Sequence, residues 1–318
     1  MADSSTPSDG EMVSPESEPS SLDLSSALLG KLPDDATTLP ARELQSPAGQ
    51  PPDVQPRLRL VGINKSFGAV RALTDVSFEV YPNEVVGLVG DNGAGKSTLI
   101  KVIAGVGPAD SGEIFVEGQP VKITSPQVAT RLGIETVYQD LALCDNLDVV
   151  ANLFLGREEH NSLRALKEVD MERRGLDVLR SLEVKIPSVR SLVASLSGGQ
   201  RQSIAVSKTI LRNARVVLLD EPTAALGVAQ TRQVLNMIRR LRDQGLAVVV
   251  ISHNLADVFE VVDRVIVLRL GRRVATFELK STTPEQVVAA ITGAEFGGLT
   301  ATADNGTNQV VSGGHVNE

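Results

Sequence analysis

The segment of residues 90–98 reads GDNGAGKST, and it constrains this 318-residue chain more than any other feature. It fits the pattern G-x-x-x-x-G-K-[ST], in which a glycine-rich loop wraps around phosphate groups. The apolar run EVVGLV at residues 84–89 precedes it, and TLIKVIA at residues 98–104 follows it with apolar side chains at helical spacing. The pattern therefore predicts a buried strand, a phosphate-binding loop and a helix in that order, rather than an ordinary glycine-rich turn.

The chemistry of the loop follows from its residue types. Glycine lets backbone N–H groups approach an anion closely because no Cβ intervenes. The helix that follows adds its unpaired N–H groups and the positive end of its dipole. Lys96 can reach the β- and γ-phosphates of a nucleotide, and the Ser97 hydroxyl can bind Mg²⁺. The predicted nucleotide-binding residues are Gly90, Asp91, Asn92, Gly93, Ala94, Gly95, Lys96, Ser97 and Thr98.

The acidity of the chain is confined to its first part. Residues 1–56 hold ten acidic and two basic side chains, which accounts for the whole net charge of −8. They also hold nine of the sixteen prolines and no aromatic residue, so they bury too little apolar surface to fold alone. We predict a disordered acidic, Pro/Ser-rich leader, with a docking or regulatory role left open. A folded domain over residues 57–295 and a flexible tail over residues 296–318 are predicted to follow.

Composition also limits the partners and surroundings of the chain. Basic and acidic side chains balance after residue 56, so no nucleic-acid partner is predicted. The single cysteine, Cys144, excludes an internal disulfide and fits a reducing compartment,; we expect it to fill space as a small apolar side chain. No signal-peptide pattern is present, and no apolar run approaches the ~20 residues of a membrane span. We expect a chain that is neither secreted nor membrane-spanning.

Apolar patterning predicts an α/β fold. Alternating residues near 58–63, 76–80 and 112–118 predict outer strands, which form a small antiparallel layer around the phosphate-loop strand,. Residues from about 140 to 213 read as mostly helical. Further apolar strands are expected at residues 134–138, 216–219, 246–251 and 265–268. A predicted helix at residues 228–242 separates the strands at 216–219 and 246–251, which gives the βαβ pattern of a parallel sheet.

Two carboxylates follow one of these strands. The run VVLLDE ends in Asp220 and Glu221, where Asp220 would hold the Mg²⁺ shell and Glu221 would act as general base toward an attacking water. A solvated acidic turn after a strand is the alternative.

The segment LSGGQ at residues 196–200 opens a predicted helix. Its glycines expose backbone N–H groups and Ser197 offers a hydroxyl at the positive end of that helix, although a plain serine-capped helix start has the same residues. Followed by the Asp-Glu strand, this segment resembles the signature of ATP-binding-cassette (ABC) ATPases. The separations, 101 residues from Lys96 to Ser197 and 23 from Ser197 to Asp220, fit one compact cassette.

The resemblance covers residues 57 to about 295 and implies a fold and a mechanism. The implied fold is a P-loop NTPase core of the RecA-like type with an antiparallel β subdomain and an inserted helical subdomain at about residues 140–213. Two cassettes of the family meet head-to-tail around ATP and Mg²⁺. The signature of one cassette then completes the site of the other, which would here involve Ser197, Gly198, Gly199 and Gln200.

Three further residues take roles by the same resemblance. Gln139, after the strand at 134–138, resembles the glutamine that approaches Mg²⁺ and links the nucleotide to the helical subdomain. His253 resembles the histidine that contacts the γ-phosphate, although a lone histidine at a strand end is usually structural. Phe67 lies where the family places an aromatic that stacks on adenine, with a core-facing phenylalanine as the alternative. One residue departs from the pattern: Gly227 stands where the family usually has an aspartate after Ala-Leu.

The resemblance also implies partners. The chain has no room for a long coiled coil, only one cassette and no membrane helices, so it resembles the ATPase subunit of an importer whose multi-span permease is a separate chain. Residues 140–158 and 285–294 resemble monosaccharide importers of the ribose/xylose/fructose type with a single cassette. The implied partners are a second cassette, permease subunits at the cytoplasmic face of the membrane and, indirectly, a solute-binding protein. An ATP-dependent dimerisation switch for a non-transport partner and an importer ATPase for a non-sugar substrate remain open.

Overall fold

A computed structural model describes residues 54–294. The predicted leader and tail therefore lie outside the described residues, apart from residues 54–56, which precede the first strand without regular structure. Within residues 54–294, no helix has both the length and the apolar character that crossing a membrane requires.

The larger of two sheets has six strands in the order β10-β9-β3-β8-β7-β6. Five of them run parallel, and β10 pairs antiparallel with β9 at one edge. Continuous apolar runs form its interior strands because both faces of a parallel sheet are covered. The bounds are β3 (Glu84–Val89), β6 (Ile134–Val137), β7 (Val216–Asp220), β8 (Ala247–Ile251), β9 (Arg264–Arg269) and β10 (Arg272–Glu278).

The smaller sheet is antiparallel, with the order β2-β1-β4-β5. Its strands are β1 (Leu58–Phe67), β2 (Val70–Val80), β4 (Ser111–Val116) and β5 (Gln119–Val121). The antiparallel layer was predicted, but its placement around the phosphate-loop strand is wrong. That strand, β3, is buried at every position and lies between β8 and β9 in the other sheet. The α/β fold class itself is confirmed.

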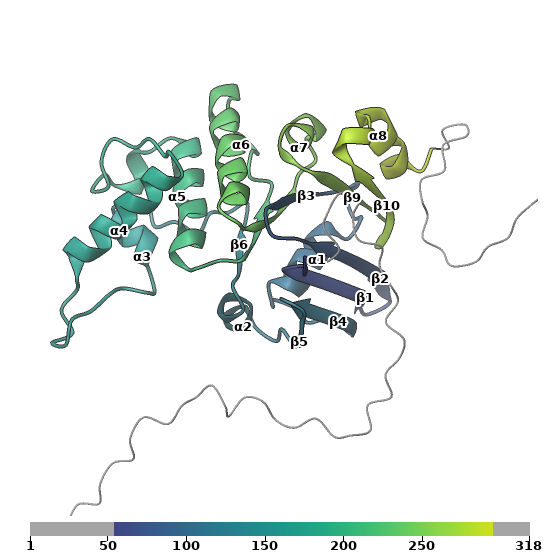
Figure 1. Ribbon diagram of the computed structural model, residues 1–318, viewed down its shortest axis with the longest axis horizontal. Helices are drawn as coiled ribbons and strands as arrows, with labels where there is room; N and C mark the ends of the chain where they lie inside the picture. Colours follow the sequence, from purple (N-terminus) through teal and green to yellow (C-terminus); the bar gives the residue numbers. More distant parts are fainter. Residues whose placement is uncertain (1–53, 295–318) are drawn as a thin grey trace, which may run out of the picture. The chain divides into compact units, whose positions relative to one another are not determined.

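Helix α1 (Lys96–Ile103) lies between the two sheets. Its apolar residues, such as Leu99 and Ile103, share one core with β1, β2 and one face of the parallel strands. The other face packs against α6 (Val228–Asp243), α7 (Leu255–Val261) and α8 (Pro284–Thr292), and Figure 1 shows these helices on the side of the sheet opposite α1. The phosphate loop that precedes α1 is thereby held at the centre of the fold.

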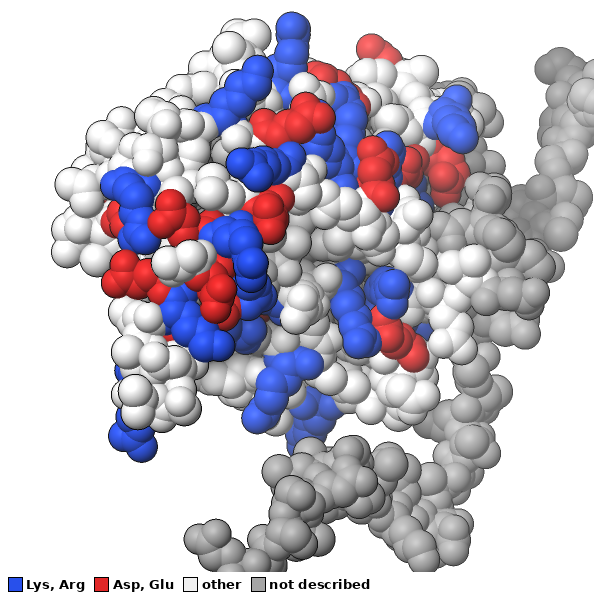
Figure 2. Space-filling model, turned by 60° about the vertical axis from the view of Figure 1, so that its left-hand side comes forward, with Lys and Arg blue, Asp and Glu red and all other residues white. Residues whose placement is uncertain are grey.

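A group of helices between β6 and β7 has a core of its own. It comprises α3 (Val149–Phe154), α4 (Glu168–Ser181) and α5 (Gly198–Leu211), all within the region predicted to be helical. Figure 1 shows them together at one end of the six-stranded sheet, beyond β6. Acidic and basic side chains lie side by side on the face seen in Figure 2. One short helix, α2 (Pro126–Arg131), precedes β6.

Candidate nucleotide-binding site

Four neighbouring strands bring the sequence motifs to one edge of the parallel sheet. The spatial order β3-β8-β7-β6 places the phosphate loop, residues 252–253, the Asp-Glu pair and residues 138–139 after four adjacent parallel strands. Ile251 pairs with Leu88 of β3 on one side and Asp220 of β7 on the other. Because the carboxyl ends of these strands meet at one edge, segments far apart in the sequence form a single site.

Close approaches by other backbone segments shape the phosphate loop. A Cβ on Gly90 (φ 153°) would lie 2.2 Å from the carbonyl oxygen of Leu268, and one on Gly95 (φ 103°) would lie 2.8 Å from that of Ala72. Neither position accommodates another residue, since both backbones also adopt angles that favour glycine. The N–H of Gly271, in the β9–β10 turn, donates to the carbonyl of Ala94 at 3.0 Å. The loop is therefore supported from two directions.

Lys96 places its ammonium group over the loop. Its Nζ donates to the carbonyl oxygens of Gly90 at 2.7 Å and Asp91 at 3.0 Å. Partial burial lowers the pKa of Lys96, while the carboxylates of Glu221, Asp91 and Asp220 oppose this shift. The positive charge thus lies between the loop and the Asp-Glu pair, where the phosphate chain of a nucleotide would need it.

Asp220 and Glu221 have different environments although they are adjacent. Burial raises the pKa of Asp220, the Glu221 carboxylate adds to the rise, and Lys96 and Lys101 oppose it. Glu221 adopts a left-handed backbone conformation (φ 51°), and its N–H donates to the carbonyl of Ile251 at 2.9 Å. That turn directs the Glu221 side chain, which is 17% exposed, toward β8.

Glu221 and His253 are in direct contact. The Oε2 atom of Glu221 lies 2.9 Å from Nδ1 of His253, whose side chain is 73% exposed. Behind the ring, Ser252 Oγ accepts from the N–H of Asn254 at 3.0 Å, and Asn254 caps α7. The structure therefore brings together a partly buried carboxylate and an exposed imidazole, two groups of the kind that can act in general acid–base chemistry.

The remaining predicted residues on this side of the site are accessible. Ser97 is exposed on the first turn of α1, and Gln139 is exposed after β6. Phe67 ends β1 with its side chain 56% exposed and Lys65 Nζ 5.5 Å from its ring centroid, which excludes the core-facing alternative.

Tyr138 lies between β6 and Gln139, and the sequence predicted it only as the last residue of a strand. Burial raises the pKa of Tyr138, a hydrogen bond with Thr136 opposes this, and the Asp220 carboxylate adds to the rise.

The LSGGQ turn lies apart from these residues. Ser197 caps α5: the N–H of Gln200 donates to Ser197 Oγ at 3.4 Å, and the N–H of Ser197 donates to Gln200 Oε1 at 3.0 Å. Gly199 is needed because a Cβ there would lie 2.9 Å from the Gln230 side chain on α6. Across residues 54–294, no hydrogen bond or ion pair links residues 197–200 to the phosphate loop, Glu221 or His253.

The loop after Glu221 leads toward α6. Thr223 Oγ1 donates to Asp257 Oδ2 at 2.6 Å, which ties this loop to α7. Gly227 donates its N–H to Gln230 Oε1 at 3.3 Å, and a Cβ on Gly227 would meet open space. The residue that departs from the family pattern is therefore not required by close packing.

A phosphate loop, a carboxylate pair and a histidine at the carboxyl edge of a parallel sheet define a P-loop nucleoside triphosphatase. Comparison with known sequences makes the class specific. The family described as ABC transporter matches residues 73–224. The chain is 44% identical over 240 residues to a xylose/arabinose import ATP-binding protein of Sulfolobus acidocaldarius, covering 76% of this chain and 95% of that one. It is also 44% identical over 248 residues to a fructose import ATP-binding protein of Rhizobium meliloti, with the same coverage.

A ribose import ATP-binding protein of Burkholderia cenocepacia is 40% identical, and the match covers 77% of this chain but 48% of that one. Among solved structures, a nucleotide-free ATP-binding cassette from an ABC transporter is 26% identical with a TM-score of 0.65, covering 75% of this chain and 96% of that one. The chain belongs to the ABC transporter family, as one of its ATPase cassettes. The resemblance to ABC ATPases that the sequence indicated is thereby confirmed.

Proposed function

We propose that this chain hydrolyses ATP to energise the import of a carbohydrate, a monosaccharide, through separate membrane subunits. The observation that carries the hydrolytic part is the contact of Glu221 with His253 beside the Lys96 loop. The carbohydrate part is supported by the two relatives matched over 95% of their length, which are import ATP-binding proteins for xylose/arabinose and for fructose.

Each part of the site has a role in this reaction. The loop N–H groups and Lys96 bind the phosphates, and the exposed ring of Phe67 stacks on adenine. Glu221 accepts the proton of the attacking water. His253 lies within hydrogen-bond distance of Glu221 and is exposed enough to reach the γ-phosphate.

The donor set fits Mg²⁺. This cation prefers oxygen ligands, and the groups that would hold it are the Ser97 hydroxyl, the Asp220 carboxylate and the Gln139 amide oxygen. The burial and the neighbouring Glu221 charge that raise the pKa of Asp220 mark a carboxylate that an added cation would stabilise. When bound, Mg²⁺ neutralises charge on the phosphate oxygens.

A second copy of the chain completes the site. Residues 197–200 carry the exposed helix start expected to face a phosphate, yet they make no polar contact with the loop of their own chain. In a head-to-tail homodimer, the Ser197 hydroxyl and the N-terminal N–H groups of α5 would face the nucleotide on Lys96 of the other copy. ATP would then form part of the interface, so that its binding favours dimers and its hydrolysis releases them.

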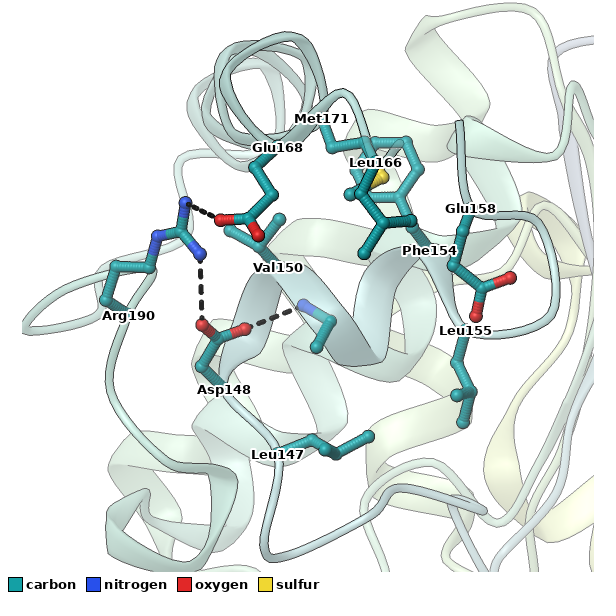
Figure 3. A pocket seen from close by; sticks show the side chains of 11 residues that line it. Leu147, Asp148, Val150, Phe154, Leu155, Glu158, Leu166, Glu168, Met171 and Arg190 are labelled. Atoms are coloured by element: carbon teal, nitrogen blue, oxygen red, sulfur yellow. Dashed lines mark hydrogen bonds and ion pairs between the residues drawn. The ribbon is translucent and has the colours of Figure 1, made fainter. Parts of the chain in front are cut away.

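A cavity of about 320 Å³ in the helical group is the site where we place the docking of the membrane subunits. It opens between α3 and α4, with an apolar floor and charged residues at its mouth (Figure 3). The lining residues include Leu147, Val150, Phe154, Leu166 and Met171 on the floor, and Asp148, Glu158, Glu168 and Arg190 around it. A permease segment seated there would hold the chain at the cytoplasmic face of the membrane, with a solute-binding protein as an indirect partner.

Purification of the chain from its source cells, together with the membrane and solute-binding proteins that it retains, tests this function. We expect a stable complex whose ATPase activity rises when the binding protein carries its monosaccharide. A complex that responds only to a non-sugar solute would contradict the carbohydrate assignment. The second candidate is an ATP-dependent dimerisation switch, which Gly227 favours because it removes a polar group from the dimer-facing loop. That function predicts no multi-span partner.

A further inference from the structure

Two backbone segments that run antiparallel, here called the two strands of a ribbon, connect the cavity with the LSGGQ turn. Residues 145–150, which include the start of α3, run antiparallel to residues 189–194, with one bridge between Asp148 and Leu192. The backbone N–H groups of Val149, Val150, Val193 and Ala194 donate to the carbonyl oxygens of Ser191, Val189, Leu147 and Asp145 at 3.2, 3.2, 3.0 and 3.1 Å, respectively. Backbone hydrogen bonds therefore pair the two segments on both sides of the bridge, and we expect a displacement of one segment to move the other.

One strand of the ribbon contributes directly to the cavity. Asp148 and its neighbours line it, and Asp148 Oδ1 accepts from the N–H of Ala151 at the start of α3 (Figure 3). Arg190, on the opposite strand, lies 3.4 Å from Asp148 Oδ2, and 3.6 and 2.7 Å from carboxylate oxygens of Glu168 and Glu172 on α4. A group that enters the cavity would thus press on both strands and on both helices at its mouth.

The other end of the ribbon meets α5 through Arg201. The Nη1 atom of Arg201 lies 3.3 Å from Oδ1 of Asp145 on the first strand, and Nη2 donates to the carbonyl of Ala194 on the second strand at 3.1 Å. The backbone N–H of Arg201 donates to the carbonyl of Ser197 at 2.9 Å. One guanidinium group therefore clamps both strands at the helix turn that begins with Ser197.

We propose that Arg201 is a positioning residue for ATP hydrolysis, which sets the orientation of the LSGGQ turn according to the position of the ribbon. This rests on the proposed function, in which Ser197 acts on the nucleotide of a second copy. The planar guanidinium offers several fixed donors and can hold two acceptors at once, whereas lysine has a single nitrogen. Asp145 is 63% exposed, and ion pairs at the surface contribute little to stability. The clamp therefore fixes geometry more than it stabilises the fold.

The test compares Arg201→Gln and Arg201→Lys in the full chain, with ATPase activity measured against both ATP and protein concentration. We expect kcat to fall at least fivefold for Arg201→Gln and by less for Arg201→Lys. ATP affinity of the monomer and Tm should stay unchanged, because the residues that hold ATP in each chain lie elsewhere. Arg173→Gln is the matched control, since Arg173 on α4 has a side chain 73% exposed and forms an ion pair with Asp170 on the same helix. This variant should match the unaltered chain.

Asp145→Asn provides a second, milder variant that removes one carboxylate charge at the surface. We expect it to lower kcat in the same direction, and the double variant with Arg201→Gln to be no slower than Arg201→Gln alone. An unchanged kcat in Arg201→Gln, or additive losses in the double variant, would overturn the clamp. Continued hydrolysis by Glu221→Gln would instead refute the proposed function, so that the two failures can be told apart.

Discussion

The Oε2 atom of Glu221 lies 2.9 Å from Nδ1 of His253, across two adjacent strands, β7 and β8, that end together. The two partners differ in freedom. Glu221 is 17% exposed and its backbone N–H is bound to Ile251, whereas the His253 side chain is 73% exposed. The pair thus joins a fixed carboxylate to an accessible ring, and the two residues should give different phenotypes when they are changed.

Glu221→Gln should abolish turnover while ATP binding is retained. A general base contributes about 10²- to 10⁴-fold to a rate, so we expect kcat to fall at least about 100-fold. Because ATP would remain bound, dimers should accumulate, which size-exclusion chromatography with ATP would detect. Glu113→Gln on β4 is the matched control, since Glu113 is exposed and lies in the other sheet. Undiminished hydrolysis would show that Glu221 is not the base.

His253→Ala should lower kcat without loss of stability. A hydrogen bond to a charged group contributes about 1.5–3 kcal/mol, which corresponds to a fall of about 10- to 150-fold. Tm should shift little because the ring is largely exposed. The control is His160→Ala, which removes an exposed imidazole from the helical group. An equal loss of activity in both variants would show that His253 has no specific role in hydrolysis.

Asp220→Asn should stabilise the nucleotide-free chain although it impairs Mg²⁺-dependent hydrolysis. Because burial raises the pKa of Asp220, the folded state keeps this proton to a higher pH than the unfolded state does. The stability that protonated Asp220 confers on the fold is therefore lost as the pH rises through the raised pKa of Asp220. We expect the gain in Tm from Asp220→Asn to be larger at pH 8 than at pH 4.

Asp177→Asn, which removes an exposed carboxylate from α4, should show no such pH-dependent gain in Tm. A destabilised Asp220→Asn chain at pH 8 would contradict the account of this carboxylate as a desolvated charge.

Phe67→Ala should weaken ATP binding more than it weakens the fold. Stacking of a base on an aromatic ring contributes about 1–3 kcal/mol, so KM for ATP should rise at least about fivefold. Phe67→Tyr should restore binding because it keeps the ring face. Leu163→Ala, at a side chain 85% exposed, is the control for loss of a surface apolar group. An unchanged KM for ATP would show that adenine does not stack on Phe67 and binds at another surface.

The site could be predicted because its residues follow long apolar runs. The strands before Asp220 and before Ser252 are buried at every position, and only the interior of a parallel sheet buries two such runs beside the phosphate-loop strand. The shared carboxyl edge follows from that topology. The start of α8 also has a local signal in the sequence. Thr283 and Gln286 form a capping box, in which the N–H of Thr283 donates to Gln286 Oε1 at 3.0 Å, and Pro284 is the first helical residue.

Other elements lacked a signal of that kind. Strand β10 (Arg272–Glu278) buries only Ala275 fully and lies at a sheet edge, so it carries no apolar run. Helix α7 has seven residues, too few to show a helical period. Helix α2 had a signal that was overlooked, since Ser125 caps it and Pro126 occupies its first turn,. The pairing of Asp145 and Arg201 joins residues 56 positions apart through side chains alone, which no local pattern reveals.

The turn between β9 and β10 has a consequence for the nucleotide itself. Gly271 donates its N–H to Ala94 in the phosphate loop and accepts from the N–H of Thr74 on β2 at 2.8 Å. Strand β2 begins at Val70, directly opposite Phe67 in the sheet. A single glycine thus connects the sheet that carries Phe67 with the phosphate loop. The hydrogen bonds on both sides of Gly271 therefore fix the spacing between the end of β1 and the phosphate loop. If Phe67 stacks on adenine as proposed, this spacing would favour ligands whose base and phosphates are the matching distance apart.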